Sequence, residues 1–166
     1  MVGGRIASVE RGRSMMPAMK STLDYSLWAV VLALAALFIC AGAAKLGDPL
    51  EFADTIAGFG ILPAALINLL ALALPMFELG CGLVLLVPRT TRIGALAVAL
   101  ISVVFFSALL SALLRGLVLD CGCFGNGAPS RPRMWLELGL DAMVFSGALF
   151  VYRRLFRSDG NARPAL

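Results

Sequence analysis

A stretch of 20 residues without a charge decides the fold class: residues 25–44 read YSLWAVVLALAALFICAGAA. At about 1.5 Å per residue, a helix of this length spans the roughly 30 Å hydrocarbon core of a bilayer. Tyr25 and Trp28 lie near its start, where interfacial aromatic residues are common. Residues 41–43 (Ala-Gly-Ala) also resemble a signal-peptide cleavage site, but the apolar run exceeds the usual roughly 7 to 15 residues of a signal peptide. The stretch therefore predicts a membrane-spanning helix.

Three more apolar segments follow, so the sequence predicts an all-α, integral membrane four-helix bundle. The spans are expected at residues 25–44, 61–87, 93–114 and 134–152, within one membrane domain over 25–152. The charges in residues 1–24 show no helical periodicity and predict a flexible tail, and residues 153–166 form a second, basic tail. Residues 45–60 form a polar connector with room for a short amphipathic helix.

Composition supports a membrane protein and excludes several function classes. Of 166 residues, 60% are hydrophobic and 14% are charged, against about 45–50% and 25% in soluble domains. The chain has no histidine, which excludes Ser-His-Asp and Cys-His catalysis and His-ligated metal centres. The net charge of +4 is explained by basic residues that flank the spans rather than by nucleic-acid binding. Any chemistry must use thiols, carboxylates and arginines.

The distribution of lysine and arginine predicts the orientation of the chain. Ten of the 14 lie in the two tails and the 88–92 turn, and four lie in the other two connections. Because basic residues are retained on the cytoplasmic side, both termini are expected in the cytoplasm, with the chain crossing a bacterial inner membrane. The loop at 115–133 then faces the periplasm, where thiols can be oxidised.

This loop contains the sequence Asp120-Cys121-Gly122-Cys123. A disulfide between cysteines so close together closes a very short, strained ring, and strained disulfides tend to be labile, catalytic or regulatory. Gly122 and Gly125 supply the backbone freedom that such a turn needs. The pair predicts redox exchange, while an inert pair of thiols and a zinc site completed by a second chain are the alternatives.

Two further cysteines lie in the spans. Cys40 precedes Lys45 by five residues, which places it about 7 Å from the outer end of the first span. It is interpreted either as a redox partner of the loop or as a small buried residue. Cys81 lies toward the inner end of the second span and is interpreted as core packing.

Ionisable residues inside spans are functional candidates because their burial in a bilayer is costly. Glu78 lies near the middle of the second span, one turn after Pro75. Glu137 and Asp141 are four residues apart and therefore share one face of the fourth span. We expect all three carboxylates to face the bundle interior, and a purely structural polar clamp is the alternative to a functional role.

Two cations are available as counter-ions for these carboxylates. Lys45 and Arg115 both lie at the predicted outer ends of spans. Arg115 also precedes Asp120 by five residues, so its charge could offset the unfavourable effect of that carboxylate on thiolate formation.

Several short motifs run through residues 25–152 in a fixed order: Ala41-Gly42, Lys45-Leu46, Asp48-Pro49, Leu62-Pro63, Pro75-x-x-Glu78-Leu79, Gly82 and Asp120-Cys121-Gly122-Cys123-Phe124-Gly125. In this set the chain resembles the methylamine-utilisation protein MauE family, which belongs with the DoxX-like four-span membrane proteins. The Cys-Gly-Cys-Phe-Gly loop is the most specific part of the resemblance.

The resemblance implies an accessory protein of the bacterial inner membrane that supports maturation of a disulfide-rich periplasmic client, the small subunit of methylamine dehydrogenase. Three function classes stay open. The first is thiol–disulfide exchange at Cys121 and Cys123, with a membrane quinone as electron acceptor. The second is a small ion-coupled transporter that uses Glu78, Glu137 and Asp141. The third is a non-catalytic membrane scaffold.

Overall fold

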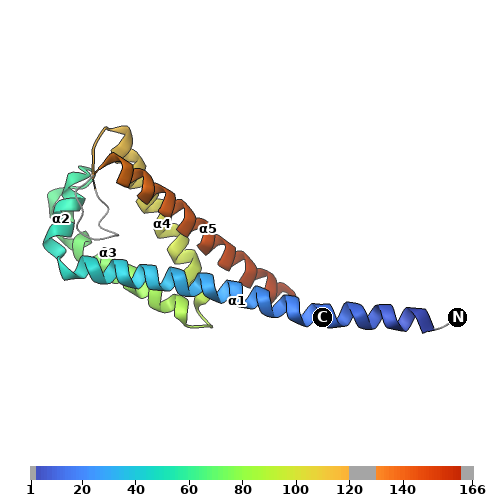
Figure 1. Cartoon of the computed structure of the whole chain (residues 1–166). Helices are drawn as coiled ribbons and strands as arrows, with labels where there is room; N and C mark the ends of the chain where they lie inside the picture. Colours follow the sequence, from blue (N-terminus) through green and yellow to red (C-terminus); the bar gives the residue numbers. More distant parts are fainter. Residues whose placement is uncertain (1–2, 120–129, 162–166) are drawn as a thin grey trace. The chain divides into compact units, whose positions relative to one another are not determined.

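The computed structural model describes the backbone of residues 3–119 and 130–161, and the side chains of residues 25–119 and 130–157. Within these ranges the chain is all-α and contains five helices (Figure 1). They are α1 (Gly3–Gly47), α2 (Pro49–Gly58), α3 (Ala64–Leu86), α4 (Thr91–Leu114) and α5 (Arg131–Asn161). The all-α prediction is confirmed, and the connector after the first span contains the short helix α2.

Four helical segments are long and apolar enough to cross a membrane: Tyr25–Gly47, Ala64–Leu86, Thr91–Leu114 and Arg131–Arg157. Each overlaps one of the four predicted spans, so the chain is a multi-pass membrane protein. The last segment extends beyond the predicted residues 134–152 at both ends. The arginines at both ends of this segment do not interrupt the helix. A long arginine side chain can place its charge at the membrane surface while its backbone remains helical.

The chain divides into two compact units, Met1–Val30 and Val31–Leu166. In the first unit, helical backbone begins at Gly3, whereas the sequence predicts a flexible tail over residues 1–24. The segment contains Ala, Arg, Met, Lys and Glu, which have favourable helix propensity even without an apolar stripe. Hydrophobic periodicity alone therefore underestimates the helical extent.

One face of α1 contributes the core of the second unit. Val31, Leu34, Ala35, Phe38 and Ala41 are buried, and they recur at the three- and four-residue spacing of a single helix face. In the same unit α4 packs against both α3 and α5, and α2 packs against α3. The functional side chains considered below are held between these helices.

The turn between α3 and α4 is stabilised by hydrogen bonds from the hydroxyl group of Thr91. The hydroxyl of Thr91 donates to the carbonyl oxygens of Leu85, at 3.1 Å, and Val87, at 2.9 Å. The first bond satisfies the carbonyl group of Leu85 near the end of α3, and the second adds to the backbone N–H groups of Thr90 and Thr91 that already donate to Val87. The turn thereby fixes how α4 starts relative to α3.

Candidate functional site

A buried ion pair lies between α1 and α3. The ammonium group of Lys45 donates to both carboxylate oxygens of Glu78, at 2.6 and 2.9 Å. Lys45 is 3% exposed and Glu78 is 2% exposed. The prediction that Glu78 faces the interior is confirmed, and the structure selects Lys45 rather than Arg115 as its counter-ion.

Glycines bring α1 and α3 close enough for this pair to form. A Cβ atom at Gly42 would lie 2.8 Å from the carbonyl oxygen of Pro75, and one at Gly82 would lie 2.7 Å from a side-chain carbon of α1. Lys45 follows Gly42 by three residues and Glu78 follows Pro75 by three. Each charged residue therefore lies about one helical turn from the contact between Gly42 and Pro75. Both lie on the helix faces where α1 and α3 pack against each other.

Two phenylalanines lie beside the Lys45 ammonium group. Its nitrogen lies 5.3 Å from the ring centre of Phe52 on α2 and 4.9 Å from that of Phe105 on α4. Cation–π attraction of this kind is strongest where water is excluded. Within the described part of the chain, the ammonium group is thus contacted by a carboxylate and two rings from three different helices. The sequence analysis singled out neither phenylalanine, because this contact depends on how α2 and α4 pack.

The same two rings border an apolar cavity of about 320 Å³ between α2, α3 and α4. Its described lining residues are Phe52, Thr55, Ile56, Phe59, Ile61, Leu62, Leu70, Leu74, Val104, Phe105, Ala108 and Leu109. Thr55 is the only hydroxyl-bearing residue among them. The cavity is therefore suited to an apolar ligand.

The two carboxylates of α5 differ in their surroundings. Glu137 is 2% exposed, and the nearest described cation is Arg133, whose Nε lies 3.5 Å from Oε1. The described contact is with Arg133, one helical turn away on the same helix, rather than with the expected Arg115 or Lys45. That four-residue spacing was visible in the sequence. Asp141 is half-buried and lies within electrostatic range of Lys45 and Glu78.

Arg115 has a structural position at the end of α4. Its guanidinium group donates to the carbonyl oxygen of Phe59, at the end of α2, and to that of Ser111 in its own helix. Gly116, the next residue, has a φ of +75°, which glycine adopts without strain. Arg115 thus joins the end of α2 to the start of the cysteine-containing loop.

The motif Asp120-Cys121-Gly122-Cys123-Phe124-Gly125 lies outside the described residues. The chain on both sides of it is described and is well anchored. Met134, at the start of α5, belongs to a buried cluster against which Phe59, Leu117 and Leu119 pack. Both flanks of residues 120–129 are therefore held in one apolar cluster.

The two described cysteines have opposite environments. Cys40 is exposed on the surface of α1, and Cys81 is buried in α3. Core packing is consistent with the position of Cys81. It does not explain Cys40, so the interpretation of Cys40 as a small buried residue is wrong.

The family of the chain follows from comparison with known proteins. A family model described as methylamine utilisation protein MauE matches residues 23–153, which include the first three spans, most of the fourth and the cysteine motif. The chain belongs to the MauE family. This match covers the ion pair, the apolar cavity and the anchored flanks of the loop.

Named MauE proteins give the same result. The chain is 38% identical over 111 residues to the methylamine utilization protein MauE of Paracoccus denitrificans, an alignment that covers 66% of this chain and 59% of that protein. It is 36% identical over 123 residues to MauE of Paracoccus versutus, covering 74% of this chain and 66% of that protein. The chain thus spans about three fifths of the length of these MauE relatives. No solved structure matches it.

Proposed function

We propose that this chain is a membrane component of methylamine utilisation that supports disulfide formation in a periplasmic client. Membership of the MauE family supports the methylamine role. The observation that carries the redox part is the Cys121-Gly122-Cys123 sequence, placed in a loop whose flanks share one buried cluster. The proposed client is the small subunit of methylamine dehydrogenase.

In the proposed exchange, the disulfide of Cys121 and Cys123 is transferred to the client. A client thiolate attacks the Cys121–Cys123 disulfide, forms a mixed disulfide, and is released when a second client thiolate attacks that bond. The client gains a disulfide, and Cys121 and Cys123 become a dithiol. Reoxidation of this dithiol releases two electrons and two protons, which a membrane quinone can accept as it becomes a quinol.

The apolar cavity is the described region best suited to such an acceptor. Its lining is apolar apart from Thr55, and Phe59 and Leu109 belong both to this lining and to the cluster that anchors the loop. Phe52 and Phe105 also belong to this lining, and the Lys45 nitrogen lies 5.3 and 4.9 Å from their ring centres. Phe59 and Leu109 therefore connect the loop flanks to the cavity, and Phe52 and Phe105 connect the cavity to the ion pair.

The proposal requires the cysteine loop to face the periplasm. In a variant that lacks Cys40 and Cys81, a membrane-impermeant maleimide added to intact spheroplasts after reduction is expected to label Cys121 and Cys123. The bias of Lys and Arg toward the tails and the 88–92 turn supports this orientation. Labelling confined to inverted vesicles would overturn it.

The functional test compares cysteine variants in cells that grow on methylamine. Cys121→Ser combined with Cys123→Ser is expected to leave the protein in the membrane while the client accumulates in a reduced, protease-sensitive form. Cys40→Ser is tested separately and determines whether this exposed thiol takes part. Normal client oxidation in the double variant would refute the redox proposal and favour a scaffold.

Ion-coupled transport is the second candidate, because one observation favours it. The Lys45–Glu78 pair, with Asp141 in electrostatic range, places ionisable groups inside the membrane-spanning region, where such groups often mark ion pathways. Transport predicts that Glu78→Gln abolishes growth on methylamine while the double cysteine variant grows normally. The redox proposal predicts that loss of the cysteines abolishes growth.

A further inference from the structure

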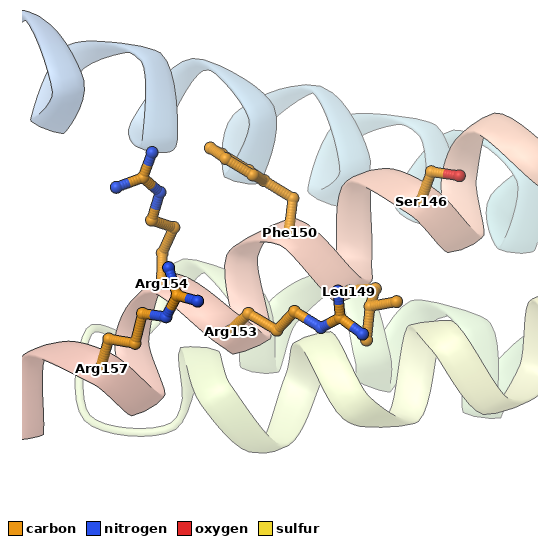
Figure 2. Close-up of a pocket in the computed structure, with 6 residues that line it drawn as sticks. All are labelled: Ser146, Leu149, Phe150, Arg153, Arg154 and Arg157. Atoms are coloured by element: carbon orange, nitrogen blue, oxygen red, sulfur yellow. The ribbon is translucent and has the colours of Figure 1, made fainter. Parts of the chain in front are cut away.

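A pocket lined by arginines lies on α5, near the end of the last span. Its described lining residues are Ser146, Leu149, Phe150, Arg153, Arg154 and Arg157, and its volume is about 370 Å³. In Figure 2 Arg154 and Arg157 lie at one end of this set and Ser146 at the other, and Arg153 lies between them. All three arginines are exposed.

The pocket changes from basic to apolar along the helix axis. Leu149 and Phe150 precede Arg157 by seven or eight residues, which corresponds to about 10 to 12 Å along α5. The membrane-spanning segment itself ends at Arg157. The basic end therefore lies at the membrane surface, and the apolar end lies within the depth of the acyl chains.

More arginines lie at the same end of the second unit. Arg89 and Arg92, from the turn and the start of α4, line a neighbouring pocket of about 560 Å³ together with Tyr152 and Leu155 of α5. The guanidinium carbon of Arg92 lies 5.3 Å from the ring centre of Tyr152. Neither set of described lining residues includes an aspartate or a glutamate. The surface is therefore strongly cationic at the level of the lipid headgroups.

A phenylalanine ring lies beside one of the pocket arginines. The guanidinium carbon of Arg154 lies 5.3 Å from the ring centre of Phe150, within the range of cation–π attraction. The N–H groups of a guanidinium can donate in pairs to phosphate oxygens. The ring thus limits the motion of a side chain that would otherwise lose more conformational entropy on binding a ligand.

We propose that this pocket binds an acidic phospholipid. Arg153, Arg154 and Arg157 hold its phosphate, and Leu149 and Phe150 contact the glycerol and the first methylene groups. The apolar half of the pocket favours a lipid over a free anion. Basic pockets at the cytoplasmic ends of membrane helices commonly recognise anionic headgroups in this way.

The test uses the purified full chain in a neutral detergent and native mass spectrometry. Phosphatidylglycerol and phosphatidylcholine with identical acyl chains are titrated separately, and inorganic phosphate is added as a competitor. Phosphatidylglycerol is expected to bind at least fivefold more tightly than phosphatidylcholine. Phosphate at the same concentration is expected not to displace it. Equal affinity for the two lipids would overturn the proposal, and displacement by phosphate would assign the arginines to a free anion instead.

Matched variants locate the site on α5. Arg157→Gln is expected to weaken phosphatidylglycerol binding at least fivefold, and Arg157→Lys is expected to weaken it less because the charge is kept. Arg131→Gln removes an exposed arginine from the opposite end of the same helix and is the control. An equal loss in Arg131→Gln would show that only net charge matters and would contradict a defined pocket. Thermal unfolding of each variant excludes loss of binding through misfolding.

Discussion

Replacing Glu78 by Gln removes one charge from the buried pair and nearly preserves the shape of the side chain. Lys45 then keeps its charge at a position that is 3% exposed. Its two hydrogen bonds to the carboxylate of Glu78, of 2.6 and 2.9 Å, no longer have an ionised acceptor. Breaking one member of a buried ion pair costs about 3–5 kcal/mol, because the remaining charge loses its closest counter-ion. We expect Glu78→Gln to reduce the free energy of unfolding by this amount.

The complementary substitution completes a double-mutant cycle. Lys45→Met leaves Glu78 charged and buried, and we expect a loss of about 3–5 kcal/mol for the same reason. In the double variant Lys45→Met, Glu78→Leu, neither charge remains and the apolar side chains fill similar volumes. The double variant should therefore be more stable than either single variant. A large coupling energy is the expected signature of the pair.

The assay is equilibrium unfolding of the purified full chain in mixed micelles, followed by helicity. Asp54→Asn is the matched control, because Asp54 is an exposed carboxylate on α2 and its replacement should change stability by less than about 0.5 kcal/mol. Single variants that lose less than about 1 kcal/mol, or effects that simply add in the double variant, would refute the role given to this pair.

Two further predictions concern packing and are measured in the same unfolding assay. Gly42→Ala is expected to cost about 1–3 kcal/mol through overpacking, because its Cβ would lie 2.8 Å from the carbonyl oxygen of Pro75. Gly139→Ala is the control and should not destabilise, since a Cβ there meets nothing within 4 Å, and equal losses would contradict the close contact. Thr91→Val is expected to cost about 1–3 kcal/mol by leaving the buried carbonyl group of Leu85 unsatisfied, whereas Ser107→Ala, at an exposed hydroxyl, should have little effect. A neutral Thr91→Val would refute the argument.

The spans could be predicted from the sequence because hydropathy and helix length act locally. The four apolar segments depend only on residues close together in the chain, so their number and approximate bounds follow without knowledge of packing. The ends of the helices were less predictable, since the buried Lys45 and the exposed Arg131 both lie within helices. Local composition alone does not distinguish a charged residue within the end of a helix from a charged residue in a loop.

The partner of Glu78 could not be chosen from the sequence. Lys45 and Arg115 were equally available as counter-ions, and the choice depends on α1 meeting α3 at Gly42 and Pro75. The rings of Phe52 and Phe105 around Lys45 depend on tertiary packing in the same way. Contacts between helices distant in the chain therefore required the structure.

The Arg133–Glu137 pair, in contrast, was predictable. Its four-residue spacing brings the two side chains together on one helix regardless of how the bundle packs. From the sequence, the distant cations Lys45 and Arg115 were considered for Glu137, and the nearby Arg133 was overlooked. Local pairs should therefore be assigned before long-range ones are considered.

The redox state of Cys121 and Cys123 in living cells shows whether this pair exchanges disulfides with a client. In a variant that lacks Cys40 and Cys81, rapid acid quenching followed by alkylation with a maleimide of high mass separates dithiol from disulfide by gel mobility. We expect a Cys121–Cys123 disulfide when no client is made, and a shift toward the dithiol when a reduced client is expressed. A pair that stays in the dithiol form under both conditions would refute disulfide exchange.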